Sequence, residues 1–256
     1  MAHPKVFGIV ALKGGVGKTT AVSNLGASLV RDYGKKVLMI DANFSTPHLG
    51  LHLGLLTPKY TLHHVLNDNH SIFEAIYQHE LGFHIIPGKL APFETSPMAL
   101  RDSLDQLRDI YDVILIDSSP SLNDEMYATM AASDELLVVS SPDYPTLSST
   151  IHAISVAKQK GTKINGIIIN KAYKKRFELS KRDIEDASGS KVLAIIPENF
   201  KVLSALSRMT PVVHNFPRQN VSVEYKKLAG SLVGEKPKRK RLFGRKKKVK
   251  KKVKKK

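Results

Sequence analysis

A glycine-rich segment follows the first apolar run of the chain and has the composition of a phosphate-binding loop. It leads into a stretch with helical periodicity and reads Lys13-Gly14-Gly15-Val16-Gly17-Lys18-Thr19-Thr20. Glycines let the backbone curl so that its N–H groups converge on phosphate oxygens, and the N-terminus of the following helix favours the same anion. In such a loop Lys18 reaches the β- and γ-phosphates and the Thr19 hydroxyl ligates Mg²⁺. The spacing therefore predicts a site for a nucleoside triphosphate with magnesium.

Two carboxylates stand where later apolar runs end. Asp41 closes the run Lys36–Asp41, and Asp117 closes the run Tyr111–Asp117. Carboxylate oxygens suit Mg²⁺, and an aspartate at the end of a strand beside a phosphate loop is well placed to hold it. A lone aspartate in this position is also a common turn or cap residue. Two of them beside one phosphate loop favour the metal role, so Thr19, Asp41 and Asp117 are the predicted magnesium ligands.

The body of the chain alternates apolar runs with amphipathic stretches. The runs are unbroken rather than alternating, which predicts strands covered on both faces, at Lys5–Ala11, Lys36–Asp41, Phe83–Pro87, Tyr111–Asp117, Glu135–Ser140, Ile164–Asn170 and Val192–Pro197. Helices are predicted between them, at Lys18–Asp32, Pro97–Ile110, Asp124–Ala132, Thr146–Lys160, Ser180–Ser188, Lys201–Arg208 and Ser222–Val233. This rhythm predicts an α/β fold with a doubly wound, mostly parallel sheet, whose ligands bind beyond the carboxyl ends of the strands.

Composition excludes several classes of site. The chain has 256 residues, of which 42% are hydrophobic, enough for one large domain. It has no cysteine, which excludes disulfide scaffolds, thiolate zinc sites, cysteine nucleophiles and iron–sulfur ligation. No stretch approaches the roughly 18 apolar residues of a membrane span, and the N-terminus lacks the layout of a signal peptide. We therefore expect a cytoplasmic protein, or one peripheral to the inner face of the cell membrane.

The positive charge is concentrated at one end. The net charge is +17, and Lys236–Lys256 holds 15 Lys or Arg with no acid. Of the 40 basic residues 25 therefore remain in the body, against 23 acidic ones. The high net charge belongs to an appendage rather than to a basic domain. We predict a phosphate-loop domain over residues 1–234 and a disordered polybasic tail over residues 235–256.

The phosphate loop departs from the common pattern at its first position. Leu12 stands where that pattern has glycine, and the loop opens on Lys13-Gly14 instead. This lysine-led KGGxGKT loop resembles that of the MinD/ParA family of deviant Walker ATPases, which hydrolyse ATP to ADP and phosphate. In that family the leading lysine crosses an ATP-sandwiched dimer and touches the partner's phosphates. The resemblance implies that role for Lys13, and with it an ATP-dependent homodimer.

The resemblance extends through nearly the whole body. Asp41–Pro47 resembles the family's switch I, and Tyr111–Pro120 resembles its Walker B strand with switch II. Asn170, Pro197 and Glu198 stand where the family lines its adenine pocket. An amide offers a donor and an acceptor together, which suits the edge of adenine. The resemblance therefore implies ATP and Mg²⁺ as cofactors, rather than GTP.

Switch I departs from the family at Asn43. The family usually has Asp-x-Asp here, and its second aspartate positions the attacking water, whereas this chain reads Asp41-Ala42-Asn43. An asparagine can hold a water but cannot take a proton, so we expect slow hydrolysis. The alternative is that Asn43 only caps the turn. The predicted catalytic residues are Lys13, Lys18, Asp41 and Asn43.

The tail permits three interpretations. It could be a solvated charge run, although so many like charges usually indicate an anionic partner. It could bind an anionic membrane surface, where each Lys or Arg is worth about 1 kcal/mol and Leu242-Phe243 adds an apolar foot. It could also bind nucleic acid by neutralising phosphates. Membrane is favoured, because Arg241-Leu242-Phe243-Gly244 resembles the C-terminal membrane-targeting segments of MinD proteins.

Together these features predict a MinD-like ATPase switch. ATP would join two subunits and double the tail's valency on a membrane, and hydrolysis would release the protein together with its unknown cargo or activating protein. One alternative is a ParA-like partition ATPase on non-specific DNA at the nucleoid. Another is a nucleotide-dependent scaffold with negligible hydrolysis. A phosphate-loop synthetase or kinase is disfavoured, because it would leave Lys13 unexplained. Branches of the family that need Cys pairs are excluded.

Some conspicuous residues carry no predicted site. His48, His52 and the pair His63-His64 lack a third ligand nearby, so we expect surface or lightly packed histidines rather than a metal centre. Phe73, Tyr77 and Phe83 are expected to be packing residues rather than a platform for stacking bases.

Overall fold

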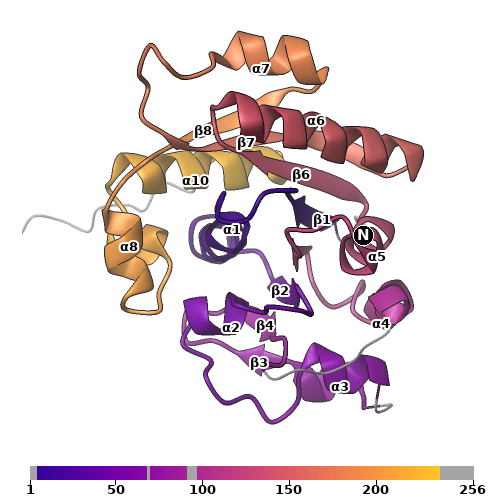
Figure 1. The fold of residues 1–256 in the computed structure, drawn as a ribbon. Coiled ribbons are helices and arrows are strands. Elements are labelled where there is room, and N and C mark those ends of the chain that lie inside the picture. The colour runs from indigo at the N-terminus through magenta and orange to yellow at the C-terminus, as the bar shows by residue number, and fades with distance from the viewer. Residues whose placement is uncertain (1–4, 68–69, 91–96, 237–256) are drawn as a thin grey trace, which may run out of the picture.

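Eight strands form one sheet, with helices on both of its faces (Figure 1). The computed structural model describes residues 5–67, 70–90 and 97–236. The strand order is β3-β4-β2-β5-β1-β6-β7-β8, and every pairing is parallel except that of β3 with β4. The strands are β1 (Lys5–Val10), β2 (Val37–Ala42), β3 (Tyr77–Gln78), β4 (His84–Ile86), β5 (Val113–Ser118), β6 (Glu135–Ser140), β7 (Lys163–Ala172) and β8 (Val192–Pro197). The predicted doubly wound α/β fold is confirmed.

The helices form two layers. The α-helices are α1 (Lys18–Tyr33), α2 (Leu49–His52), α3 (Leu62–Asn67), α4 (Leu100–Asp105), α5 (Asp124–Ala132), α6 (Tyr144–Gln159), α7 (Lys181–Ser188), α8 (Lys201–Leu206), α9 (Val212–Asn215) and α10 (Asn220–Leu232). Two short 3₁₀ helices, η1 (Ile72–Ala75) and η2 (Pro97–Ala99), complete them. One core cluster joins α1, α9 and α10 to the sheet, and two others join α4, α5, α6 and α7 to its opposite face (Figure 1).

The unbroken apolar runs follow from this layering. In β1, Phe7 and Ile9 pack in the cluster around α1, whereas Val6 and Val10 pack on the opposite face. Successive side chains of a strand point to opposite faces, so a strand covered on both must be apolar at every position. The same alternation holds in β5, where Val113 and Leu115 share the α1 side.

The sequence-based prediction did not include the short elements, and it was wrong about the exposure of His63 and Phe73. It did not predict α2, α3, α9, η1 or the two-residue strand β3, and the predicted helix Pro97–Ile110 is shorter, as η2 followed by α4. His63 is completely buried, not superficial: its Nε2 lies 3.1 Å from the carbonyl oxygen of Phe44, and its Nδ1 accepts from the Lys89 N–H at 3.0 Å. Phe73, expected in the packing, is 48% exposed.

No helix in the described part of the chain is long and apolar enough to cross a membrane. Residues 237–256 lie outside the described residues, so the division into domain and tail stays a prediction.

Candidate nucleotide-binding site

The phosphate loop connects β1 to α1 in a conformation that requires glycine. Gly15 and Gly17 have φ angles of 74° and 98°, in the left-handed region that side chains other than glycine rarely adopt. Gly17 also caps α1, since its carbonyl oxygen accepts from the Ala21 N–H at 2.9 Å. The N-terminus of this helix therefore points at the loop, as the anion site requires.

Asn170 of β7 fixes the loop from the opposite side. Its Nδ2 donates to the carbonyl oxygen of Val16 at 2.7 Å, and the side chain is buried. A Cβ atom built on Gly17 would lie 2.2 Å from that Nδ2. The residue predicted to line the adenine pocket thus also holds the phosphate loop in place.

A cleft of about 440 Å³ opens above the loop, within the size range of ligand pockets. Most of the predicted binding residues line it: Gly14, Gly15, Gly17, Lys18, Thr19, Thr20, Asn43, Asn170, Pro197 and Glu198. Val16 does not, because it is buried and contributes its carbonyl oxygen to Asn170. The cleft is also lined by residues that were not individually predicted as binding residues, of which Thr46, Ser118 and Pro120 belong to the predicted switch segments: Thr46, His48, His52, Ser118, Pro120, Lys171, Asn199, Val202, Leu203, Leu206 and Tyr225.

The two predicted carboxylates lie side by side on neighbouring strands. Asp41 of β2 and Asp117 of β5 are register partners, with 0% and 1% of their surface exposed. Both Asp41 oxygens are engaged, since Oδ1 accepts from the Asn43 N–H at 3.2 Å and Oδ2 from the Leu49 N–H at 2.8 Å. Within the described chain neither oxygen of Asp117 accepts a hydrogen bond of normal geometry, although the Thr19 hydroxyl and the Lys18 ammonium both interact with this carboxylate.

Burial controls the electrostatics of this pair. It raises the pKa of Asp117 to about 6, although the Thr19 hydroxyl and the Lys18 ammonium oppose the shift. Burial and the neighbouring Asp117 also raise the pKa of Asp41 well above its ordinary value. Burial lowers the pKa of Lys18, and Asp117 opposes this. An added cation at this place would stabilise the ionised form of both carboxylates.

The residues present fit a magnesium ion. Two buried carboxylates and the Thr19 hydroxyl are hard oxygen donors of the kind that Mg²⁺ prefers. A cation would also satisfy the buried oxygens of Asp117. The described residues hold no group of three or more His, Asp or Glu side chains arranged for a metal ion. A site with so few protein carboxylates suits an ion that keeps water and phosphate oxygens as further ligands.

Lys13 does not reach into this cleft. Its Nζ donates to the Thr146 hydroxyl at 2.8 Å and lies 3.5 Å from the Asp143 carboxylate, with 46% of its side chain exposed. Asp143 caps α6 by accepting from the Thr146 N–H at 2.9 Å. The lysine that leads the loop is therefore directed to the start of α6.

Asn43 lines the cleft while its side chain caps the switch I turn. Its Nδ2 donates to the carbonyl oxygen of Thr46 at 2.5 Å, and its Oδ1 lies 3.3 Å from the Thr46 hydroxyl. The capping role considered for this residue is thus present in the structure. Ser45 next to it donates to Glu125 of α5, which connects the turn to the opposite helix layer.

Comparison with known proteins assigns the family. A family model described as AAA domain matches residues 4–165. The septum site-determining protein MinD of Thermotoga maritima is 31% identical over 242 residues, covering 90% of this chain and 88% of that protein. The chromosome partitioning protein ParA of Caulobacter vibrioides is 32% identical over 259 aligned positions, covering 91% and 95%. The chain belongs to the MinD/ParA family of P-loop ATPases.

A solved member of this MinD/ParA family carries the expected ligand. MinD of Pyrococcus horikoshii, determined in complex with Mg-ADP, matches with a TM-score of 0.85 and 29% identity, covering 90% of this chain and 96% of that one. ATP and Mg²⁺ are accordingly the cofactors of this MinD/ParA ATPase.

The first prediction tests the loop geometry. In Gly17→Ala the new methyl group meets Asn170 and the residue keeps a left-handed φ, so we expect the free energy of unfolding to fall by about 1–3 kcal/mol. Gly14→Ala is the control, because its methyl group meets no protein atom within 4 Å. It should change the stability by less than about 0.5 kcal/mol. Chemical denaturation without nucleotide measures both variants, and equal losses would contradict the assigned loop conformation.

Proposed function

We propose that the protein is a MinD-like switch that dimerises on binding ATP, positions itself or a cargo on an anionic membrane surface, and hydrolyses ATP slowly. The observation that carries the proposal is the placement of Lys13. This residue leads the phosphate loop, but it contacts Thr146 and Asp143 outside the cleft. Nucleotide binding within its own subunit therefore does not explain why a lysine stands at this position. A half-exposed ammonium beside the mouth of the cleft can reach the phosphates of a facing subunit.

The contacts described above support the following proposed roles in and around the cleft. Backbone N–H groups of Gly14–Thr20 and the Lys18 ammonium hold the phosphates, and Thr19, Asp41 and Asp117 hold Mg²⁺. Bound Mg²⁺ supplies charge neutralisation on the β- and γ-phosphates. Asn170, Pro197 and Glu198 lie at the end of the cleft formed by β7 and β8, where the adenine would sit.

A ParA-like function on DNA is the second candidate. The ParA relative is as similar to this chain as the MinD relative, at 32% against 31% identity. The tail's charge suits duplex DNA as well as anionic lipid. Both surfaces therefore belong in the experiment on the tail.

The second prediction separates the two lysines. Lys13→Ala should keep the affinity for ATP and lose ATP-dependent dimerisation and turnover, because it removes the contact across the dimer, and the bonds to Thr146 and Asp143 that it also removes lie outside the cleft. Lys18→Ala should weaken ATP binding itself, by tenfold or more, because it removes a charge from the β- and γ-phosphates. Lys158→Ala on α6 is the control, since this exposed lysine is absent from the cleft. Calorimetry and size-exclusion light scattering measure the two properties, and equal effects of both variants on both would overturn the trans role of Lys13.

The third prediction concerns the tail. Truncation after Glu235 leaves the body's last contacts in place, because the Glu235 carboxylate pairs with Lys35 at 2.6 Å and its N–H donates to the Gly230 carbonyl oxygen at 2.9 Å. We expect the truncated protein to lose flotation with anionic vesicles and to keep its basal ATPase. The full chain should bind such vesicles in an ATP-dependent way that falls steeply with salt.

Titration with duplex DNA is the parallel arm of this experiment. Tail-dependent binding to DNA but not to vesicles would favour the ParA-like function over the MinD-like one. Flotation of the truncated protein at low salt would place the membrane contact elsewhere in the chain.

The fourth prediction concerns Asn43. Asn43→Asp removes the donor to Thr46 and supplies a carboxylate that can position water, so single-turnover hydrolysis should quicken and the dimer should be shorter-lived. Asn43→Ala also removes the bond to Thr46 but adds no oxygen, so it should not quicken hydrolysis. Equal single-turnover rates in the two variants would restrict Asn43 to capping the turn.

A further inference from the structure

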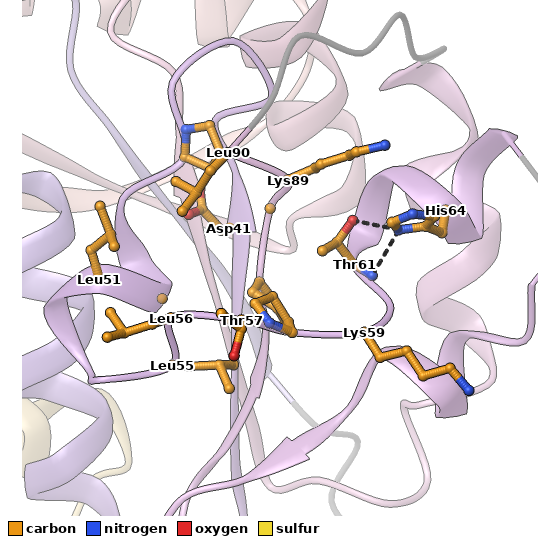
Figure 2. Close-up of a pocket in the computed structure, with 15 residues that line it drawn as sticks. Asp41, Leu51, Leu55, Leu56, Thr57, Lys59, Thr61, His64, Lys89 and Leu90 are labelled. Atoms are coloured by element: carbon orange, nitrogen blue, oxygen red, sulfur yellow. Dashed lines mark hydrogen bonds between the residues drawn. The ribbon is translucent and has the colours of Figure 1, made fainter.

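A second cavity, of about 350 Å³, is lined by residues of switch I and of neighbouring segments, none of which lines the nucleotide cleft (Figure 2). It is enclosed by α2, the segment leading to α3, and the residues that follow β4. Most of its wall is apolar, and the side chains that form this part are Pro47, Leu51, Leu55, Leu56, Pro58, Pro87 and Leu90. Its volume falls in the range of small-molecule sites.

This cavity is not a defect of the packed core. Leu56 and Leu90 are 48% and 57% exposed, so apolar side chains surround an opening to solvent. A ligand that covers them removes apolar surface from water. An apolar hollow with polar groups on one side is the usual form of a binding site.

The charges around the cavity are cationic. Lys59 and Lys89 line it on the α3 side, together with His64, whose Nδ1 accepts from the Thr61 N–H at 3.1 Å (Figure 2). Among the described lining residues the single acid is Asp41. Its carboxylate is buried and accepts the N–H groups of Asn43 and Leu49.

The cavity and the nucleotide cleft share one wall. Along residues 41–52, Pro47, Gly50 and Leu51 line the cavity, whereas Thr46 and His48 line the cleft. The bond from the Leu49 N–H to Asp41 joins this wall to the predicted magnesium ligand. A molecule that binds two arrangements of this segment with different affinities changes what the cleft binds, and such coupling is reciprocal.

We propose that this cavity binds a small amphipathic anion, with a compact apolar body against the leucines and a carboxylate or sulfonate group toward the side of the cavity that Lys59 and Lys89 line, and that its occupancy changes the affinity of the cleft for Mg-ADP. This site goes beyond the proposed switch function. It does not depend on the dimer, the tail or the rate of hydrolysis.

The probe for the site is 8-anilinonaphthalene-1-sulfonate, which combines an apolar body with an anionic group. It is titrated into the full chain saturated with Mg-ADP, so that the nucleotide cleft is already filled. We expect one saturable site by fluorescence. Leu56→Glu places a carboxylate at the opening and should weaken binding tenfold or more. Phe73→Glu is the matched control, because Phe73 is equally exposed at 48% but lies outside the cavity. Equal losses in both variants, or binding that does not saturate, would overturn the site.

The ligand class is tested by competition between octanoate and octanol, which differ in charge but share an alkyl chain. Octanoate should displace the probe at a concentration at least tenfold lower than octanol. The double substitution Lys59→Gln with Lys89→Gln should remove this difference. Equal competition by the two molecules in the unmodified chain would overturn the anionic class.

The coupling is measured as the affinity for Mg-ADP with and without saturating octanoate. We expect a change of about fivefold or more that Leu56→Glu abolishes and Phe73→Glu preserves. An unchanged affinity for Mg-ADP while octanoate is bound would overturn the coupling. Because ADP binding and probe binding are read directly, this result is independent of whether the chain dimerises or binds a membrane.

Discussion

The structure depends on one electrostatic constraint: two carboxylates are buried side by side on neighbouring strands under the phosphate loop. Asp41 and Asp117 are register partners in the middle of the sheet, and water reaches neither of them. Burying like charges together is unfavourable unless cations or hydrogen-bond donors compensate. The fold supplies part of this compensation through Lys18 and Thr19. In the proposed function Mg²⁺ with nucleotide would supply more, so that ligand binding would relieve a cost that the folded chain already carries.

This constraint explains why switch I is built as it is. Asp41 cannot turn toward solvent, so its oxygens accept N–H groups from the segment that follows it. Those bonds, with the Asn43 cap on Thr46, hold residues 41–49 in one arrangement. Ionisation of Asp41 changes how strongly its oxygens accept these N–H groups. The segment that carries the N–H groups forms the shared wall of the cleft and the second cavity. The Asp41 carboxylate thus couples its own charge state to the position of switch I.

Sequence reasoning succeeded where the determinants are local. The phosphate loop can be recognised because it is a contiguous motif. The central strands can be recognised as unbroken apolar runs because both of their faces are covered. Asp41 and Asp117 lie together near the carboxyl ends of β2 and β5, as expected for parallel strands whose ends meet at one edge, and their role toward Mg²⁺ stays a prediction. Short elements such as α2 and α3 gave no periodic signal, since one or two turns are too short for a pattern to develop. His63 was predicted to lie at the surface because no residue near it in the sequence indicates its hydrogen bonds to Phe44 and Lys89.

The contacts that the sequence could not predict join distant segments. Lys13 meets Thr146, 133 positions away, and Asn170 meets Val16, 154 positions away. Each follows from the strand order, which brings β1, β6 and β7 together, and no local pattern encodes it. The family resemblance gave Asn170 a role toward adenine but not its second role as the support of the loop.

The arrangement of α1 and α10 limits how nucleotide can control the tail. α1 begins at the phosphate loop and packs against α10, and the Tyr33 hydroxyl donates to the Lys226 carbonyl oxygen at 2.7 Å. Gly230 lies so close to Tyr33 that a Cβ atom there would be 2.3 Å from its hydroxyl. In the proposed switch we therefore expect the number of tails brought together by ATP, rather than a change in any one tail, to set the affinity for a surface. A nearly neutral body with a strongly basic appendage suits that proposal, because two tethered tails would bind a charged surface more tightly than one.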